Sequence, residues 1–336
     1  MNFEYLRARD LSEAIMMLNR FGEDSKILAG GTELFVNMKQ HAIAPKYLID
    51  IKSITKLSYI KYDEEGVLRI GALTPLRAIE RSHEIRDRHP IIVEAVRSIA
   101  TLQIKNVATI GGNLCQTVKC PYFNQSHINL FMRQSLEPCR QRGGSICHAS
   151  RRDTLGHSIL GKGANGCFAL TASDLATPLI ALKASVKAVG PNGERFIPIE
   201  HFFIGGGRNA LQRNEIITEV QIPSVHGITR SKYQKYAQDV RNFSILILAA
   251  IIWLTLDKKA CKDIRIVLGG MGVIPLKLDS LEERLKNGEV ACLRIEDSVK
   301  NELEGIKTYG TMSEYKLRRA GTMIIDVVKF LIAEEA

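Results

Sequence analysis

Short apolar runs alternate with amphipathic stretches at the start of the chain. Three apolar runs are typical of strands and lie at residues 3–6, 26–29 and 47–51. The stretches between them have the spacing of helices, and Asp10 with Glu13 forms a potential capping box for the first. The pattern predicts strand, helix, strand, helix and strand, which make a small α/β subdomain over residues 1–55.

Similar patterning continues to about residue 227, with one long interruption. It predicts two hairpins, one further strand and three helices, with strands at 57–62, 67–70, 186–189, 194–197 and 216–222 and helices at 75–82, 90–99 and 176–182. The interruption at 118–168 has no clear period and is rich in Cys, Arg, Gly, Ser and His. Segments of this length without regular structure are uncommon in a compact domain and are usually functional. We expect a second α/β subdomain over 56–227 with a functional insertion at 118–168.

Residues 228–336 have a third kind of pattern, in which apolar strands come first and helices follow. Strands are predicted at 231–237, 245–256 and 262–269. In the last helix one apolar stripe faces the core and consists of Ala320, Met323, Ile324, Val327, Val328 and Leu331. We expect a C-terminal α/β domain with an antiparallel sheet and packed helices, and an α+β fold class for the whole chain.

Composition narrows the class of protein. The chain has 336 residues, 45% hydrophobic and 24% charged, which is ordinary for a soluble globular protein. No apolar run reaches the ~18 residues of a membrane span, and the first 20 residues do not resemble a secretion signal, so we expect a cytoplasmic protein. The net charge is +10, but the basic residues are scattered, so nucleic-acid binding is not expected. Seven cysteines without a secretion signal argue against a disulfide framework.

Two glycine turns are candidates for phosphate binding. They are Ala29-Gly30-Gly31-Thr32 and Ile110-Gly111-Gly112-Asn113. Glycine allows the main chain to approach a diphosphate closely, and the helix after the first turn adds its positive end. Each turn alone is more often a simple loop. The chain has neither GxGxxG after a strand nor GxxxxGK[ST], so a Rossmann or P-loop protein is disfavoured.

Four cysteines of the insertion, Cys120, Cys139, Cys147 and Cys167, form a candidate metal-ligand set. Four thiolates can hold a [4Fe–4S] cluster or a zinc ion. Zinc would also suit His127, His148 and His157 in the same segment. Unrelated free cysteines are the remaining alternative. No Ser-His-Asp or paired-carboxylate constellation stands out, so no catalytic residue is assigned.

The segments ILAGGTEL (27–34), QIKNVATIGGNL (103–114), SDL (173–175) and EIITEVQIP (215–223) together resemble one family. This family is the FAD-binding subunit of molybdenum hydroxylases, the xanthine dehydrogenase and carbon monoxide dehydrogenase group. The resemblance implies the PCMH/CO dehydrogenase flavoprotein fold and an oxidoreductase subunit whose two glycine turns hold the FAD diphosphate. It implies cofactor contacts from Leu28, Ala29, Gly30, Gly31, Thr32, Glu33, Leu34, Ala108, Thr109, Gly111, Gly112, Asn113, Cys115, Ser173, Asp174, Ile217 and Lys235. Lys105 stands where the family more often has arginine.

The insertion resembles one branch of that family. KCPYFNQS (119–126), PCRQRGGSICH (138–148) and the cysteine before ALTASDLATPLIAL (169–182) are similar to the iron–sulfur insertion of the 4-hydroxybenzoyl-CoA reductase beta subunit. The resemblance implies a [4Fe–4S] cluster on Cys120, Cys139, Cys147 and Cys167, with Cys115 the alternative fourth ligand.

The implied function is electron transfer within a larger complex. The implied partners are a large molybdopterin-binding subunit and a small [2Fe–2S] subunit, with ferredoxin or NAD(P) as the external redox partner. Two alternatives stay open: an FAD subunit of a generic xanthine, aldehyde or N-heterocycle hydroxylase, and a zinc-stapled scaffold without redox chemistry.

Overall fold

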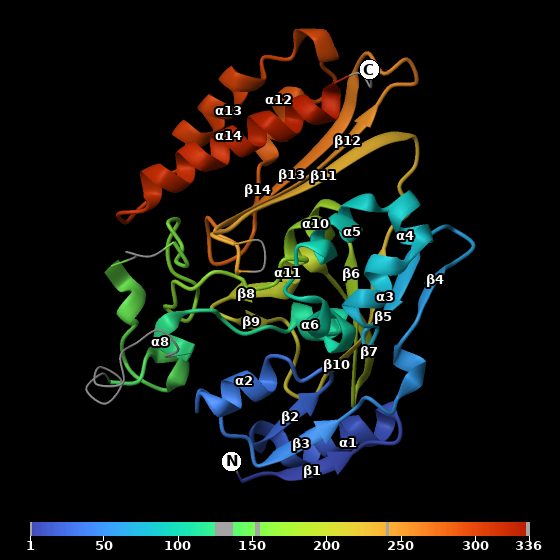
Figure 1. Ribbon diagram of the computed structural model, residues 1–336, viewed down its shortest axis with the longest axis vertical. Coiled ribbons are helices and arrows are strands. Elements are labelled where there is room, and N and C mark those ends of the chain that lie inside the picture. The colour runs from blue at the N-terminus through green and yellow to red at the C-terminus, as the bar shows by residue number, and fades with distance from the viewer. Residues whose placement is uncertain (1, 125–136, 152–154, 240–241, 334–336) are drawn as a thin grey trace.

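A computed structural model describes residues 2–124, 137–151, 155–239 and 242–333 (Figure 1). The N-terminal region folds as the predicted alternation of strands and helices, with β1 Glu4–Arg7, α1 Leu11–Phe21, β2 Ser25–Leu28, α2 Leu34–Lys39 and β3 Tyr47–Asp50. The strands form a parallel sheet in the order β1-β3-β2. Asp10 caps α1 as predicted, because its side chain accepts a hydrogen bond of 2.9 Å from the Glu13 N–H. The Glu13 carboxylate accepts from the N–H of Arg9, so the return bond of the capping box is displaced by one residue.

The second region is built on a five-stranded antiparallel sheet in the order β4-β5-β10-β6-β7. Its strands are β4 Ile60–Tyr62, β5 Leu68–Gly71, β6 Ser185–Gly190, β7 Gly193–Pro198 and β10 Ile216–Ile222. The helices of this region are α3 Leu76–Arg81, α4 His83–Arg88, α5 Pro90–Arg97, α6 Leu102–Val107, α7 Ile110–Leu114, α10 Ala176–Ala181 and α11 Ile199–Phe202. A short ribbon of β8 Phe203–Gly205 and β9 Arg208–Asn209 follows α11. The helices at 83–88, 102–107, 110–114 and 199–202 were not predicted.

The insertion has little regular structure where it is described. It contains α8 Pro121–Asn124 and short 3-10 turns at Arg140–Arg142 and His148–Arg151. In Figure 1 it projects from one side of the molecule, beside the β8–β9 ribbon. His127, one of the candidate zinc ligands, lies outside the described residues.

The C-terminal region has the predicted antiparallel sheet followed by helices. The sheet runs in the order β11-β12-β13-β14, with β11 Ile228–Tyr236, β12 Leu246–Leu254, β13 Cys261–Gly269 and β14 Leu276–Lys277. Three helices, α12 Asp279–Leu285, α13 Ile295–Glu304 and α14 Ser313–Ile332, lie along one face of it (Figure 1). The predicted stripe of α14, from Ala320 to Leu331, is buried against the sheet.

The central strand β12 is buried on both faces. Ile247, Ala249 and Ile251 pack with the core of the second region, which includes residues of α5 and α10. Their neighbours Leu248 and Ile252 pack with the core under α12–α14. Because both faces are covered, the strand is a continuous apolar run without polar alternation.

In the described part of the chain, the three larger sheets fall one each within the ranges 1–55, 56–227 and 228–336, and the β8–β9 ribbon lies in the second range. The division of the chain into units with these boundaries stays a prediction. Among the described residues, no helix combines the length and the apolar character needed to cross a membrane.

Candidate flavin site and cysteine cluster

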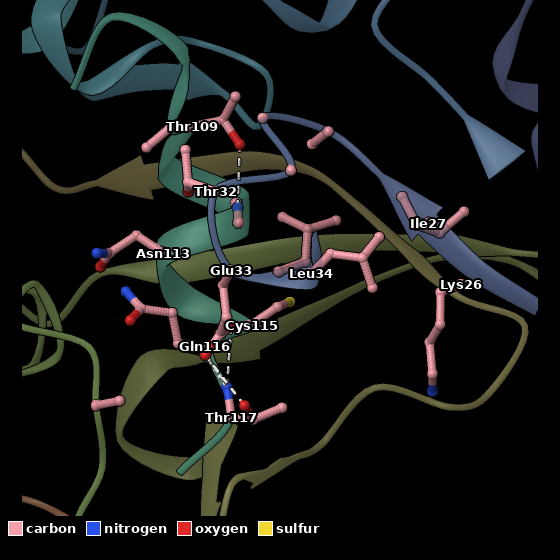
Figure 2. Close-up of a pocket in the computed structure, with 18 of the residues that line it drawn as sticks. Lys26, Ile27, Thr32, Glu33, Leu34, Thr109, Asn113, Cys115, Gln116 and Thr117 are labelled. Carbon is pink, nitrogen blue, oxygen red and sulfur yellow. Dashed lines mark hydrogen bonds between the residues drawn. The ribbon is translucent and has the colours of Figure 1, made fainter. Parts of the chain in front are cut away.

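A cavity of about 890 Å³ lies between the N-terminal and second regions and is lined by both glycine turns (Figure 2). This volume is in the range of about 300–1,000 Å³ that is common for ligand and cofactor pockets. The predicted site residues that line it are Ala29, Gly30, Gly31, Thr32, Glu33, Leu34, Ala108, Thr109, Gly111, Gly112, Asn113, Cys115, Asp174, Ile217 and Lys235. Leu28 and Ser173 are buried beside it and do not line it.

The first glycine turn connects the end of β2 to the start of α2. A Cβ atom on Gly30 would lie 2.1 Å from the carbonyl oxygen of Val107, at the end of α6. Gly31 has φ +70°, a conformation that residues with a side chain rarely adopt. The first turn therefore requires glycine for two reasons, a close approach to the end of α6 and a left-handed backbone.

The second glycine pair lies inside a helix, which corrects the prediction of a turn. Thr109 is the N-cap of α7, and its Oγ1 accepts a hydrogen bond of 3.1 Å from the Gly112 N–H (Figure 2). Gly111 is packed closely, since a Cβ there would lie 3.0 Å from the Cβ of Ala72. The prediction missed this helix because two adjacent glycines disfavour helix, and the Thr109 cap was the signal that could have found it.

Ser173 does not face the cavity itself but orients Asn113, which does. Its hydroxyl donates a hydrogen bond of 2.7 Å to Oδ1 of Asn113, and both side chains are buried. Asn113 lines the cavity from α7. Ser173 thus fixes the orientation of an amide group that faces the cavity.

A buried ion pair closes another part of the wall. The ammonium of Lys235, on β11, lies 2.8 Å from Oδ2 of Asp174 and donates a bond of 3.0 Å to the Ser98 carbonyl. Ser244 donates to the other carboxylate oxygen at 3.2 Å. Burial raises the pKa of Asp174, and the nearby Lys235 and Ser244 offset part of that rise. Ile217, on β10, adds an apolar contact to the cavity wall.

Glu33 links the first glycine turn to the start of the cysteine-rich insertion at 118–168, called the cysteine segment below. Its carboxylate accepts hydrogen bonds of 3.2 Å from the Thr117 N–H and 3.0 Å from the Thr117 hydroxyl (Figure 2). It also forms an ion pair with Lys119, the residue before Cys120. Lys119 and Phe243 both line the cavity, and the ammonium of Lys119 lies 5.3 Å from the centre of the Phe243 ring. Neither was predicted as a site residue. Their side chains follow no periodic pattern that would have identified them.

Cys115, a predicted cofactor contact, and Lys105, a noted departure from the family pattern, are both explained by local packing. Cys115 ends α7 and lines the cavity, and burial raises the pKa of its thiol to about 12. Lys105, where the family more often has arginine, is buried and pairs with Glu80 at 2.9 Å. It does not line the cavity.

The four cysteines of the candidate ligand set belong to one small buried cluster. Cys120, Cys139, Cys147 and Cys167 pack with Val118, Phe123, Ala149 and Ala169. Cys115 packs against a different core, so the structure groups Cys167 with the other three. The Cys167 thiol donates a hydrogen bond to Cys147, which lowers the pKa of Cys147 to about 5 and raises that of Cys167. Burial raises the pKa of Cys120 to about 11.

Backbone N–H groups face all four sulfur atoms. Tyr122 and Phe123 donate to Cys120, Gln141 and Arg142 to Cys139, Ala149 and Phe168 to Cys147, and Ala169 to Cys167. Such donors stabilise the thiolate form that ligates a metal. Even so, within residues 2–124, 137–151, 155–239 and 242–333 no three Cys, His, Asp or Glu side chains form a ready-made metal site.

One of the candidate histidines touches the cluster. Nε2 of His157 lies 3.5 Å from Sγ of Cys120, and the side chain is fully buried. His148 lies further out and bonds to the Glu137 carbonyl at 2.7 Å.

The backbone oxygen of His157 accepts from Lys316, a fully buried lysine of α14 that was not predicted. Lys316 is in phase with the apolar stripe that begins at Ala320, and this was the signal for its burial.

A cavity of this size with two glycine segments in its wall is typical of proteins that can bind a phosphate-bearing cofactor. Residues 1–225 match the family described as the FAD binding domain in molybdopterin dehydrogenase, and the chain belongs to this family. It is an FAD-binding oxidoreductase subunit of the molybdenum hydroxylase type.

Curated relatives share about a quarter of their residues with the chain. The aldehyde oxidoreductase FAD-binding subunit PaoB of Escherichia coli K12 is 28% identical over 86% of this chain and 87% of the relative. The xanthine dehydrogenase FAD-binding subunit of Escherichia coli O157:H7 is 27% identical over 98% of this chain and 96% of the relative. The carbon monoxide dehydrogenase medium chain of Hydrogenophaga pseudoflava is 26% identical over 84% and 79%.

Solved structures share the fold of the whole chain. Carbon monoxide dehydrogenase from Hydrogenophaga pseudoflava superimposes with a TM-score of 0.77 at 23% identity, covering 98% of this chain and 97% of that one. Quinoline 2-oxidoreductase from Pseudomonas putida 86 gives a TM-score of 0.74 at 17% identity, covering 99% and 97%. The predicted flavoprotein fold is therefore confirmed.

Proposed function

We propose that this chain is the electron-transfer subunit of a three-subunit molybdenum enzyme. It relays electrons between an external redox partner and a large molybdopterin-binding subunit, with a small [2Fe–2S] subunit completing the complex. The observation that carries the proposal is the cavity between two glycine segments in a chain of the FAD-binding family. The names of the relatives, which are FAD-binding subunits and a medium chain, support assembly with further subunits.

The two glycine segments are the part of the site that would hold the FAD diphosphate. Gly30 and Gly31 let the first turn pack tightly against the end of α6, and Thr109 begins α7 beside them. Main-chain N–H groups in such glycine turns can bind phosphate oxygens. Lys235 and Asp174, which form the wall on the β11 side, would be contacts elsewhere along the cofactor. Bound FAD supplies two-electron and one-electron transfer, and the chain positions it and controls its surroundings.

The cysteine cluster is proposed to hold a [4Fe–4S] cluster on Cys120, Cys139, Cys147 and Cys167. The support is their joint burial and the backbone N–H groups aimed at their sulfur atoms. A zinc ion is the competing occupant, and the contact of His157 with Cys120 favours it. We infer a redox cluster because Glu33 and Lys119 join the cofactor cavity directly to this segment.

For the complex as a whole, the cysteine segment favours a reaction like that of 4-hydroxybenzoyl-CoA reductase, with ferredoxin as electron donor. The second candidate is a hydroxylase that delivers electrons to NAD(P) or another acceptor. It is favoured by the relatives, whose names refer to aldehydes, xanthine and carbon monoxide. We also propose a cytoplasmic location, because reducing compartments keep thiols free and the seven cysteines are unpaired.

Flavin, iron, acid-labile sulfide and zinc analysis of anaerobically purified protein tests the two cofactor assignments. We expect FAD, iron and sulfide, with a visible spectrum to match. Cys120→Ser should lose iron and sulfide and keep FAD, whereas the matched variant Cys261→Ser, buried in the C-terminal core, should keep all three. A preparation without flavin refutes the flavoprotein assignment, and zinc without sulfide refutes the iron–sulfur assignment.

The reaction is tested on the assembled complex. Production of benzoyl-CoA from 4-hydroxybenzoyl-CoA and a reduced dye supports the reductase. Oxidation of an aldehyde or of xanthine with an oxidised dye, without that product, supports the hydroxylase.

A further inference from the structure

Lys316 is a fully buried lysine without a carboxylate partner among the described residues. It is 0% exposed, and its ammonium donates hydrogen bonds of 2.9 Å to the His157 carbonyl and 2.7 Å to the Gly270 carbonyl. Two carbonyl groups solvate a cation only in part. A buried charge is costly unless it is paired, so this position calls for a nearby negative charge.

The residue that Lys316 binds is in contact with the cysteine cluster. The imidazole of His157 is 0% exposed, and its Nε2 lies 3.5 Å from Sγ of Cys120. The His157 backbone forms a β-bridge with Ala169, two residues after Cys167. His157 therefore lies between the ammonium of Lys316 and two of the four cysteines.

The neighbouring backbone fixes this arrangement. The Ser158 N–H donates to the Phe168 carbonyl at 2.8 Å, and the Ile159 N–H donates to the Met271 carbonyl at 2.9 Å. Residues 157–159 are held from one side by the cysteine segment and from the other by the turn after β13. The ammonium of Lys316 is thus held at a fixed position on the side of His157 away from the cysteine cluster.

Burial lowers the pKa of Lys316 to about 7, because no acidic group among the described residues offsets it. Four thiolates around an iron–sulfur core carry a net negative charge, which would attract the ammonium of Lys316. The net charge around such a centre and the hydrogen bonds to its sulfur atoms are two of the factors that set its reduction potential.

We propose that Lys316 and His157 tune the electron affinity of the centre held by the four cysteines, Lys316 through its buried positive charge and His157 through a hydrogen bond from Nε2 to the sulfur of Cys120. This inference rests on the proposed iron–sulfur occupancy. Adding one electron from an external reductant increases the negative charge at the centre. The ammonium and the N–H donor both favour that reduced form, so removing either one lowers the reduction potential.

The test is a dye-mediated redox titration of the assembled complex, followed by electron paramagnetic resonance of the reduced cluster. A unit charge about 10 Å away, at an effective dielectric constant of about 20, changes an equilibrium about tenfold. Lys316→Met should therefore shift the ratio of reduced to oxidised cluster about tenfold at fixed potential, which is ~59 mV for a one-electron centre. Lys316→Arg keeps the charge and should stay near the wild type.

The matched control is Lys329→Met, which removes an exposed lysine from the same helix, far along it from Lys316. It should leave the potential unchanged. For the histidine, His157→Leu should lower the potential, and His157→Gln, which retains a side-chain N–H donor, should restore most of it.

A second readout separates tuning from folding. In metal-free protein Lys316→Met should be as stable as the wild type or more stable, because an unpaired buried charge is removed. If Lys316→Met fails to load the cluster, the His157 pair carries the test. Unchanged potentials in Lys316→Met or His157→Leu with full iron and sulfide overturn the inference and leave the cluster assignment intact. Wild-type protein without iron and sulfide overturns the cluster assignment itself, and this inference with it.

Discussion

Substitution of Gly30 by alanine should separate the two walls of the flavin cavity. The new Cβ would lie 2.1 Å from the Val107 carbonyl oxygen, whereas ordinary contacts begin at 3.4 Å, so one turn must move by the difference of 1.3 Å. The atoms that resist this movement are backbone atoms of α6 and the residue after it, Val107 and Ala108, which cannot rotate away. The first glycine turn must therefore shift relative to the end of α6 and to Ala108.

The expected loss of FAD affinity is about 100-fold, because a misplacement of about 1 Å in a positioned site costs about that factor. Ligand linkage translates this into stability. At an FAD concentration 100 times the wild-type Kd, FAD stabilises the wild type by about 2.7 kcal/mol and the variant by only about 0.4 kcal/mol.

Two assays measure these quantities: quenching of FAD fluorescence on titration with flavin-free protein, and urea unfolding with and without FAD. Gly305→Ala is the control, since its Cβ would meet nothing closer than 3.5 Å. Wild-type FAD affinity in a folded Gly30→Ala protein would refute the close contact between the first glycine turn and the end of α6 as the basis of the site.

Three further substitutions test the walls of the cavity. Ser173→Ala removes the donor to Asn113 and should cost about 1–3 kcal/mol of stability, measured by urea unfolding, together with FAD affinity. Lys235→Met leaves the buried Asp174 carboxylate without its cation and should cost about 3–5 kcal/mol at neutral pH. In this variant the carboxyl pKa of Asp174, already raised by burial, should rise further. The folded variant then holds that proton more tightly than the unfolded chain does, so its loss of stability relative to the wild type grows from pH 5 to pH 8. Glu33→Gln removes the charge that pairs with the cysteine segment and should cost about 1–3 kcal/mol, measured by thermal unfolding.

One exposed ion pair provides controls for the charged substitutions. Lys300 and Glu304 are 72% and 65% exposed, and such surface pairs contribute little. Lys300→Met and Glu304→Gln should therefore leave stability nearly unchanged. A deficit of Lys235→Met that is equal at pH 5 and pH 8 would contradict the assignment of Asp174 as the titrating group, and a wild-type Ser173→Ala protein would contradict the role of its hydroxyl.

The regular elements were predictable where one physical signal dominated. The strand at 216–222 and the hairpin at 185–198 follow from apolar alternation and a glycine turn, and the α1 cap follows from Asp10. The short helix α7 escaped prediction because its glycines oppose helix and its stability comes from the Thr109 cap and from burial. Local propensity was outweighed there by tertiary packing.

The glycine and cysteine segments of the site could be predicted from the sequence, but the hydrogen bonds and ion pairs between them could not. Glycines and cysteines can be selected as candidates from residue type alone. The partner of Glu33, Thr117, could not, because their contact depends on how a segment 84 residues away folds back. The helical phase of Lys316 signals its burial, but its acceptors, the carbonyls of His157 and Gly270, are backbone groups that no side-chain pattern identifies.

The two-sided burial of β12 has a consequence for how this chain can be divided. The family match ends at residue 225, yet Ile247, Ala249 and Ile251 complete the hydrophobic interior of the matched part. A fragment truncated at 225 would expose that interior to water, and a fragment starting at 228 would expose the sheet face that carries Ile247, Ala249 and Ile251. Expression of either half by itself should yield aggregates, whereas the two halves produced together should recover a soluble complex.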